Sequence, residues 1–200
     1  MSRKPSNRIS CMSDLLNNLH LAAVEFDYSV LEAVYSAEIS RQILEFVHEE
    51  ISAEDVFESE EIKGKEDKPH ITILYGIREQ LPNVPKIQQV IQNHPSMSRV
   101  KWLGLAKFEA EQWDVLIIRV ESPEGEELFH DFNNIYPDNA NSYPDYEPHT
   151  TLAYVQKGKA DKYIDKYGDI FVDDSVEINR IRFDFNGAAT DFDPATADAI

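Results

Sequence analysis

The chain has 200 residues, 42% of them hydrophobic and 28% charged, as in a soluble globular protein with one sizeable core. Its formal net charge is −18, and eight acidic residues with no Lys or Arg lie between Glu45 and Ile62. This balance disfavours binding to long nucleic acids, which depends on a basic surface. No run approaches the ~20 apolar residues of a membrane-spanning helix, so no contact with a membrane is expected.

The first 20 residues predict a disordered or frayed lead. They contain no signal-peptide core, because Asp14 and two asparagines interrupt the segment that follows the basic start. The single cysteine, Cys11, excludes an internal disulfide, and this favours a cytoplasmic location.

The next segments predict a strand at residues 19–27 and a helix at residues 35–51, from their apolar spacing. We expect the acidic run to be a solvated helix face followed by a loop. Further along the chain, the pattern predicts four strands and two helices, at 69–75 (strand), 83–94 (helix), 99–110 and 113–122 (two strands of a hairpin), 123–136 (helix) and 149–155 (strand).

The loop at residues 137–148 is crowded with Pro, Asn and Asp, as a binding loop or lid often is. A short helix at 159–168 and a last strand at 175–186 follow it. The residues after Gly187 are expected to form a loose acidic tail. The domain is therefore predicted to span residues 21–186.

One short motif occurs twice. "KPHITILYG" and "EPHTTLAYV" share Pro, His, Thr and Tyr at the same offsets, and both have apolar residues three and four positions after the histidine. Each copy lies on a predicted strand between two predicted helices. The chain therefore looks like two related lobes that each contribute one central strand.

Alternation along these strands predicts where the shared residues point. His70 and Thr72 share one face, as do His149 and Thr151, so two adjacent strands would bring two imidazoles and two hydroxyls together. Tyr75 and Tyr154, at odd offsets, are predicted to face the other way and to pack in the core.

Such a cluster suits the cleavage of a phosphodiester. One imidazole can take a proton from the attacking hydroxyl while the other gives a proton to the leaving oxygen. The threonine hydroxyls can hold the phosphate oxygens. No metal or other cofactor is expected, because H-E-x-x-H and paired cysteines are absent from the sequence.

The other histidines lack this context. His94 also begins an H-x-[ST] match, but Pro95 lies inside it and the match falls at a predicted helix end. His20, His48 and His130 are interpreted as surface or helix residues. The structural alternative is that His70 and His149 are two histidines of a sheet whose hydrogen bonds are all made and which have no catalytic role.

The paired motifs "HIT" and "HTT" in a two-lobed α+β chain resemble the 2H phosphoesterase superfamily, most closely the phage anti-CBASS cyclic-oligonucleotide phosphodiesterases. The resemblance implies a pseudo-twofold fold with antiparallel sheets around a central cleft and outer helices. It implies metal-independent cleavage of the 3′–5′ bonds in cyclic nucleotide signals of bacterial antiviral defence. The cytoplasm would then be that of the host cell if a phage encodes the chain. The resemblance assigns His70 and His149 as the acid/base pair and Thr72 and Thr151 as phosphate-holding residues.

Two alternatives stay open. One is a 2H enzyme that acts on 2′–5′ oligoadenylate or on RNA 2′,3′-cyclic phosphate ends, and the other is a nucleotide-binding module without catalysis. Stacking of a nucleobase needs a flat side chain, for which Trp102 is the first candidate and Trp113 the second. Lys68 and Glu147 each lie two residues before a motif histidine, where Lys68 could meet a phosphate. The sequence leaves the oligomeric state open.

Overall fold

The computed structural model describes residues 28–60, 62, 64–122, 124–141 and 145–200. Its main elements repeat one order, strand–helix–strand–helix–strand, and this repeat agrees with the two lobes predicted from the motifs. The first five are β1 (Ser29–Tyr35), α2 (Ala37–Glu50), β2 (His70–Ile77), α3 (Val84–Asn93) and β3 (Arg99–Glu109). The second five are β4 (Trp113–Glu121), α4 (Gly125–Ile135), β5 (His149–Gln156), α5 (Ala160–Tyr167) and β6 (Val172–Phe185), and β7 (Ala188–Phe192) follows them.

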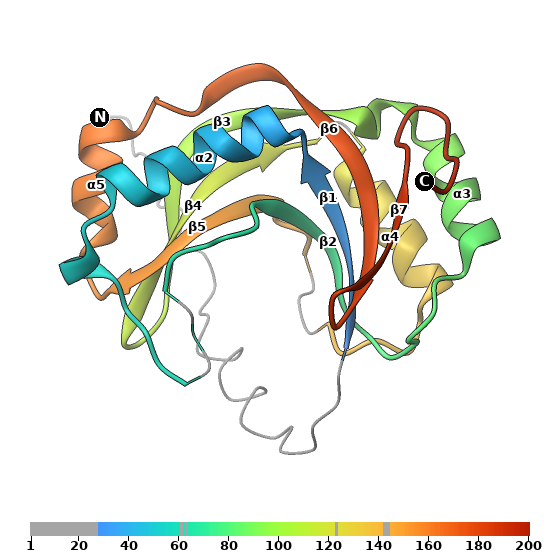
Figure 1. Ribbon diagram of the computed structural model, residues 1–200, viewed down its shortest axis with the longest axis horizontal. Coiled ribbons are helices and arrows are strands. Elements are labelled where there is room, and N and C mark those ends of the chain that lie inside the picture. Colours follow the sequence, from blue (N-terminus) through green and yellow to red (C-terminus); the bar gives the residue numbers. More distant parts are fainter. Residues whose placement is uncertain (1–27, 61, 63, 123, 142–144) are drawn as a thin grey trace, which may run out of the picture.

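The strands form a seven-stranded sheet in the order β2-β1-β6-β3-β4-β5, with β7 on β6, and every pairing is antiparallel. The third strand of each repeat pairs with the first strand of the other, since β3 pairs β4 and β6 pairs β1. The sheet bends into an arch, in which β2 and β5 meet at the centre and run apart in opposite directions (Figure 1). The chain thus has the α+β fold predicted for it.

Helices cover the outer face of the arch and leave its inner face to the two motif strands. α2 and α5 lie over one half and α3 and α4 over the other (Figure 1). The apolar side of α2 is fixed by Phe46, whose ring packs edge-on against Tyr167 at 5.3 Å and Phe171 at 5.2 Å. The helix begins where the Ser36 hydroxyl accepts a hydrogen bond from the Ile39 amide, the usual N-cap.

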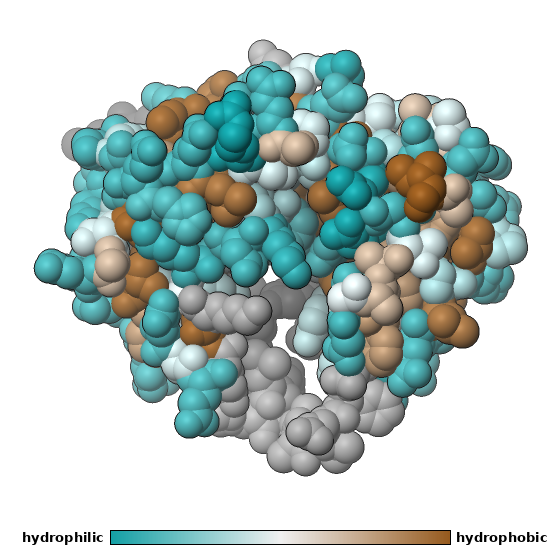
Figure 2. Space-filling view, in the orientation of Figure 1, coloured by the Kyte–Doolittle hydropathy of each residue, from teal (hydrophilic) through white to brown (hydrophobic). Residues whose placement is uncertain are grey.

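The surface follows the charge pattern of the sequence. Hydrophilic side chains cover the part over α2, and the surface is hollowed below the middle of the arch (Figure 2). Asp55 departs from the expectation of a solvated acidic run, because it is buried and bonded to Lys162, Lys159 and the Tyr163 hydroxyl. No helix in the described part of the chain is long and apolar enough to cross a membrane.

The first strand differs from the prediction. The predicted strand at 19–27 and the predicted lead lie outside the described residues. β1 instead covers Ser29–Tyr35, where Ser29, Leu31, Ala33 and Tyr35 are buried and the residues between them are half-buried. No strand is predicted for these residues, although their alternation is regular.

The prediction of a loose tail after Gly187 is wrong. β7 pairs with β6, and Phe192 and Ala197 are fully buried. The Asp191 carboxylate accepts two hydrogen bonds from Arg182 and one from Arg180. The acidic composition of this segment gave no sign of the two buried residues, Phe192 and Ala197. The negative charge of Asp191, which faces the sheet, is neutralised by Arg180 and Arg182.

Candidate active site

The four residues predicted from the motifs lie on the inner face of the arch, at its centre. On β2, His70 and Thr72 alternate with Ile71 and Ile73, which are buried in the core. On β5, His149 and Thr151 alternate in the same way with the buried residues Thr150 and Leu152. His70 is close enough to His149 to affect its titration. The fold therefore brings both pairs together, because β2 and β5 meet where each strand begins.

Both imidazoles are held in the same way. Nδ1 of His70 lies 2.7 Å from the Lys68 carbonyl oxygen, and Nδ1 of His149 lies 2.7 Å from the Glu147 carbonyl oxygen. A carbonyl oxygen only accepts, so Nδ1 carries the proton in each ring. In a neutral ring this leaves Nε2 as the proton acceptor, which is the state that a general base needs.

An acidic side chain lies beside His70. Glu32 on β1 is opposite Thr72, and its Oε1 lies 3.7 Å from Nε2 of His70. Burial raises the pKa of Glu32, while the charges of His70 and Arg182 act in the other direction. An ionised Glu32 can therefore form an ion pair with His70 when that imidazole carries a second proton. The first half of the site therefore suits a proton donor.

The surroundings of His149 are different. The Phe108 ring lies edge-on to the imidazole at a centroid distance of 4.8 Å. Burial lowers the pKa of His149, and the nearby His70 lowers it further, against the hydrogen bond to the Glu147 carbonyl. Arg119 on β4 is the cross-strand neighbour of His149 and is exposed. The second half of the site therefore suits a neutral base with a cation beside it.

Two tyrosines support the motif strands from the core side, Tyr35, which is buried, and Tyr146, which is partly buried. The Tyr35 hydroxyl lies 2.7 Å from the Thr150 hydroxyl and accepts a hydrogen bond of 3.1 Å from the Trp102 indole. Burial raises the pKa of Tyr35 to about 12, so this hydroxyl stays protonated. On the other strand, the Tyr146 hydroxyl donates to the Thr72 carbonyl at 3.4 Å. Each lobe thus braces the motif strand of the other.

The prediction for Trp102 is wrong. Its side chain is 4% exposed, packs edge-on against Phe171 at 5.3 Å and bonds to Tyr35 on the core side of β3. No nucleobase can reach it there. Trp113, the second candidate, shares the inner face with Val115, but it stacks on Phe57 six residues from Arg119. At about 3.3 Å per residue, this is ~20 Å along β4 from the centre.

The prediction for the two tyrosines is also wrong. The pairing register shifts between Leu74 and Thr72 on β2 and between Ala153 and Thr151 on β5, so each strand carries a β-bulge. Two consecutive residues of each strand then point to the core. Tyr75 and Tyr154 are turned onto the same face as the histidines, and Tyr75 is 46% exposed.

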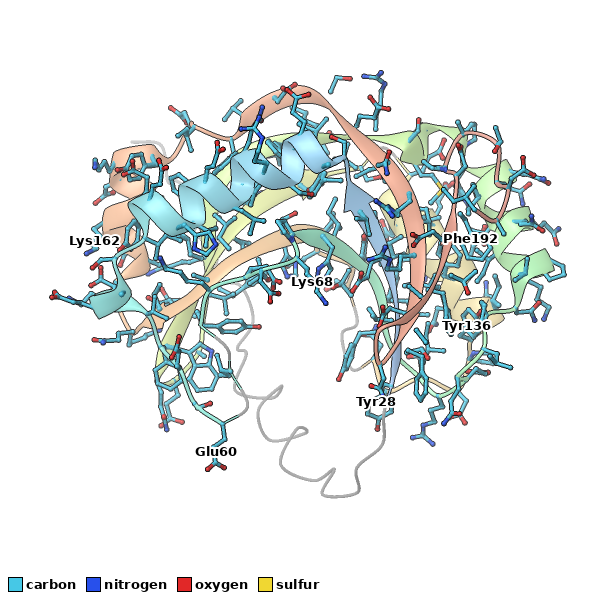
Figure 3. The ribbon with its side chains drawn as sticks, viewed as in Figure 1. Tyr28, Glu60, Lys68, Tyr136, Lys162 and Phe192 are labelled. Atoms are coloured by element: carbon cyan, nitrogen blue, oxygen red, sulfur yellow. The ribbon has the colours of Figure 1, made fainter. Side chains whose placement is uncertain are left out.

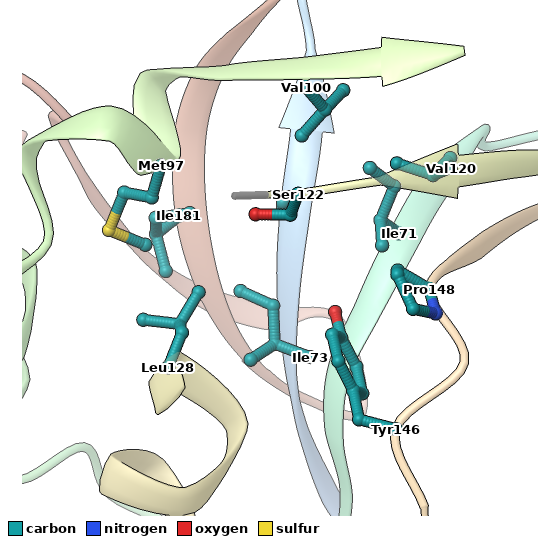
Figure 4. A pocket seen from close by; sticks show the side chains of 11 residues that line it. Ile71, Ile73, Met97, Val100, Val120, Ser122, Leu128, Tyr146, Pro148 and Ile181 are labelled. Atoms are coloured by element: carbon teal, nitrogen blue, oxygen red, sulfur yellow. The ribbon is translucent and has the colours of Figure 1, made fainter. Parts of the chain in front are cut away.

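The small cavity beneath β2 is not part of this face. It has a volume of about 20 Å³ and lies on the core side, with Ile71, Ile73 and Leu128 in its wall (Figure 4). The Tyr146 ring closes it on one side (Figure 4). Within the described ranges, no group of three or more His, Cys, Asp or Glu is placed to hold a metal ion.

Residues 39–180 match the family described as anti-CBASS protein Acb1. The chain belongs to this family. The match spans well over half of the chain and includes both H-x-T motifs. It confirms the predicted resemblance to the anti-CBASS phosphodiesterases, so this Acb1-family chain is a phosphodiesterase with a role against CBASS.

Several solved structures match most of the Acb1-family chain at low identity. Usb1 of Kluyveromyces marxianus has 8% identity and a TM-score of 0.46, and the match covers 84% of this chain and 98% of that chain. TT0787 of Thermus thermophilus has 12% identity and a TM-score of 0.47, over 78% and 86%. LigT of E. coli in apo form has 12% identity and a TM-score of 0.40, over 87% and 93%. A search of curated proteins found no match.

The remaining histidines lie away from the Acb1-family motifs. His94 is buried between two carboxylates. Its Nε2 lies 2.9 Å from Asp131 and its Nδ1 lies 3.2 Å from Glu124, so it links the end of α3 to α4. His48 and His130 are exposed on helices, as expected, and His20 lies outside the described residues. Lys68 and Glu147 are exposed, and Lys68 lies below the centre of the arch (Figure 3).

The sequence pattern does not indicate Glu32, Phe108 and Arg119 as members of the candidate site. Glu32 lies on the strand that was not predicted. Arg119 lies on a strand that was predicted, and its charge in an otherwise apolar run was a signal. Only the register between β4 and β5 shows that it is next to His149.

Proposed function

We propose that this Acb1-family chain cleaves 3′–5′ phosphodiester bonds in cyclic oligonucleotide second messengers, in the cytoplasm of the host cell and without a metal ion. The observation that carries this proposal is the pair of imidazoles at the centre of the arch, each with Nδ1 bound to a backbone carbonyl at 2.7 Å. Membership of the anti-CBASS family supports the choice of signal. The formal charge of −18 supports a small substrate over a long nucleic acid.

His149 is the general base in this proposal. Its pKa is lowered by burial and by His70, so the ring is neutral near pH 7 and Nε2 is free to accept a proton. His70 is the general acid, because Nε2 of its imidazole faces the Glu32 carboxylate at 3.7 Å, the partner that an imidazolium needs. His70 lies beside the Glu32 carboxylate and His149 beside the Arg119 guanidinium. This difference in charge assigns different roles to two histidines that occupy equivalent positions.

The reaction follows from these roles. His149 takes the proton of the ribose 2′-OH, whose oxygen attacks the phosphorus, and His70 gives a proton to the 5′-oxygen as the P–O5′ bond breaks. The products are a 2′,3′-cyclic phosphate and a free 5′-OH. Attack by water on the same phosphorus is the competing route.

Three polar groups stabilise the charge that develops on the phosphate. Thr72 and Thr151 share the inner face with the histidines and can donate hydrogen bonds to the non-bridging oxygens. Arg119, the exposed neighbour of His149, adds a guanidinium on the side of the base. Among the described residues Arg119 forms no ion pair, so it is available to an anionic ligand.

A substrate panel tests the proposal. The purified protein is incubated in EDTA with 3′,3′-cyclic di- and trinucleotides, linear 2′–5′ oligoadenylate and RNA with 2′,3′-cyclic phosphate ends, and products are separated by chromatography. Cleavage of the cyclic substrates is expected. Cleavage of only the 2′–5′ or cyclic-phosphate substrates would instead support the alternative 2H activity, on 2′–5′ oligoadenylate or on RNA 2′,3′-cyclic phosphate ends. Tight binding without turnover would make it a binding module.

A further inference from the structure

Two tyrosines occupy equivalent positions in the two halves of the site. Tyr75 and Tyr154 each follow a motif histidine by five residues. The β-bulges turn both side chains onto the inner face. Tyr75 lies between the Leu31–Leu74 and Ser29–Ile77 pairs of β1 and β2, and Tyr154 lies opposite Val115 on β4. The same departure from regular alternation, at the same offset, thus occurs in both lobes.

The tyrosines lie on opposite sides of the catalytic centre. Each is separated from its histidine by four regular strand steps once the bulge is discounted, or ~13 Å along the strand. Because β2 and β5 run apart from the middle of the arch, Tyr75 and Tyr154 are carried away from the centre in opposite directions (Figure 1).

The rings, and not the hydroxyls, are the available part of these side chains. Neither hydroxyl forms a hydrogen bond with any other residue that the structure describes. Tyr75 is 46% exposed, and the ring of its neighbour Tyr28 lies 6.0 Å from its ring at a tilt of 56°. Tyr154 is half-buried beside Glu66, and burial raises its pKa. An exposed, unbonded phenol on a strand is poorly explained by core packing.

The backbone around each tyrosine is held in place. The Tyr154 amide donates to the Gly64 carbonyl at 2.7 Å, and its carbonyl accepts from the Phe57 amide at 2.9 Å. Next to Tyr75, the Gly76 carbonyl accepts from the Ala140 amide at 2.8 Å. The loop between α2 and β2 thus fixes the outer edge of β5, and the loop between α4 and β5 fixes the outer edge of β2. The two rings are therefore presented on rigid supports.

We propose that Tyr75 and Tyr154 are stacking platforms for the two nucleobases that flank the scissile phosphate. This inference rests on the proposed function, because it takes the phosphate to lie between His70 and His149. A phosphodiester held there has one nucleoside on either side, and each base then extends along one strand toward one tyrosine. Stacking on an aromatic ring tolerates every base, since every base has a flat π face.

Binding measurements on the full chain test the inference. The ligand is 3′,3′-cyclic diadenylate with phosphorothioate linkages, which slow cleavage, and affinity is measured by calorimetry. Tyr75→Leu and Tyr154→Leu should each lower the affinity at least fivefold, while Tyr75→Phe and Tyr154→Phe should keep it within twofold. Leu81→Ser, at a residue 81% exposed and away from the site, is the control for surface substitution.

The outcomes separate this inference from the proposed function. If the wild-type chain binds and the leucine variants bind equally well, the stacking role is overturned while the proposed function stands. If the phenylalanine variants lose as much affinity as the leucine variants, the hydroxyls act and stacking is overturned. If the wild-type chain neither binds nor cleaves the cyclic ligand, both proposals fail. Urea unfolding of each variant identifies any loss that is due to misfolding.

Discussion

Glu32 and His70 lie on neighbouring strands, with a carboxylate oxygen 3.7 Å from the imidazole Nε2. Replacing Glu32 with Gln keeps the size of the side chain and removes the carboxylate that faces the proposed acid. Protonated His70 then loses its ion-pair partner, so kcat/KM should fall about tenfold, which corresponds to about 1.4 kcal/mol. Glu147→Gln is the matched control, because Glu147 holds His149 through its backbone. A wild-type kcat/KM in Glu32→Gln would contradict the assignment.

Phe108 shields His149 from water. Phe108→Ser should expose the imidazole and weaken the burial that lowers the pKa of His149. Since a base must be unprotonated to act, the acid limb should move to higher pH while the basic limb stays in place. Phe57→Ser, which changes an aromatic residue that stacks on Trp113, is the control. Movement of the basic limb alone would show that His149 is the acid.

Arg119 is predicted to bind a phosphate of the substrate. Arg119→Leu should raise KM about tenfold and reduce the dependence of KM on salt, because a charge-assisted hydrogen bond is lost. Arg119→Lys should restore only part of the effect, since Lys cannot form the two parallel bonds of a guanidinium. Arg99→Leu, at an exposed residue on β3 that bonds to Ser175, should leave KM unchanged. Equal KM values for wild type and Arg119→Leu would exclude this role.

Tyr35 links Thr150 and Trp102 behind the second motif. Tyr35→Phe leaves both partners without their hydrogen bond, so the free energy of unfolding should fall by ~1–3 kcal/mol. The rate should fall as well, because Thr150 lies between His149 and Thr151. Urea unfolding and kcat are measured together. A stable variant with normal kcat would show that this network does not position the motif.

The C-terminal segment is expected to be a structural part of the sheet. Truncation after Gly187 removes the buried Phe192 side chain, whose burial alone stabilises by about 1.5–3 kcal/mol. Asp191→Asn removes the charge that Arg180 and Arg182 share. Burial raises the pKa of Asp191, but the hydrogen bonds from Arg182 and Arg180 lower it by more, so the pKa lies below its usual value. The stability that these ion pairs contribute is therefore present at neutral pH and is lost as the pH falls through that lowered pKa. A truncated chain that unfolds at the wild-type urea concentration would contradict this expectation.

Most of the architecture could be predicted from the sequence, because local periodicity sets where helices and strands occur. The duplicated motif also led to the two lobes and the four residues at the centre. What could not be predicted is the register between strands, since it depends on contacts that are distant in sequence. Glu32 lies opposite Thr72, and Arg119 opposite His149, only because of those registers.

The errors have identifiable causes. Tyr75 and Tyr154 were assigned to the core by strict alternation, yet both motifs have apolar residues three and four positions after the histidine. Two consecutive core residues in one strand are the signature of a bulge, so the signal was present. Trp102 could not be placed, because the face of β3 changes at the bulge near Gly104, whose φ of 92° favours glycine.

Cleavage by histidine variants tests the central claim most directly. Wild type, His70→Ala, His149→Ala and the double variant are incubated with a 3′,3′-cyclic dinucleotide in EDTA, and the initial rates are compared. Each single variant should lose about 10²- to 10⁴-fold in rate. The double variant should lose far less than the product of the two, because the pair acts as a unit. A wild-type rate in either single variant would contradict the two-histidine mechanism.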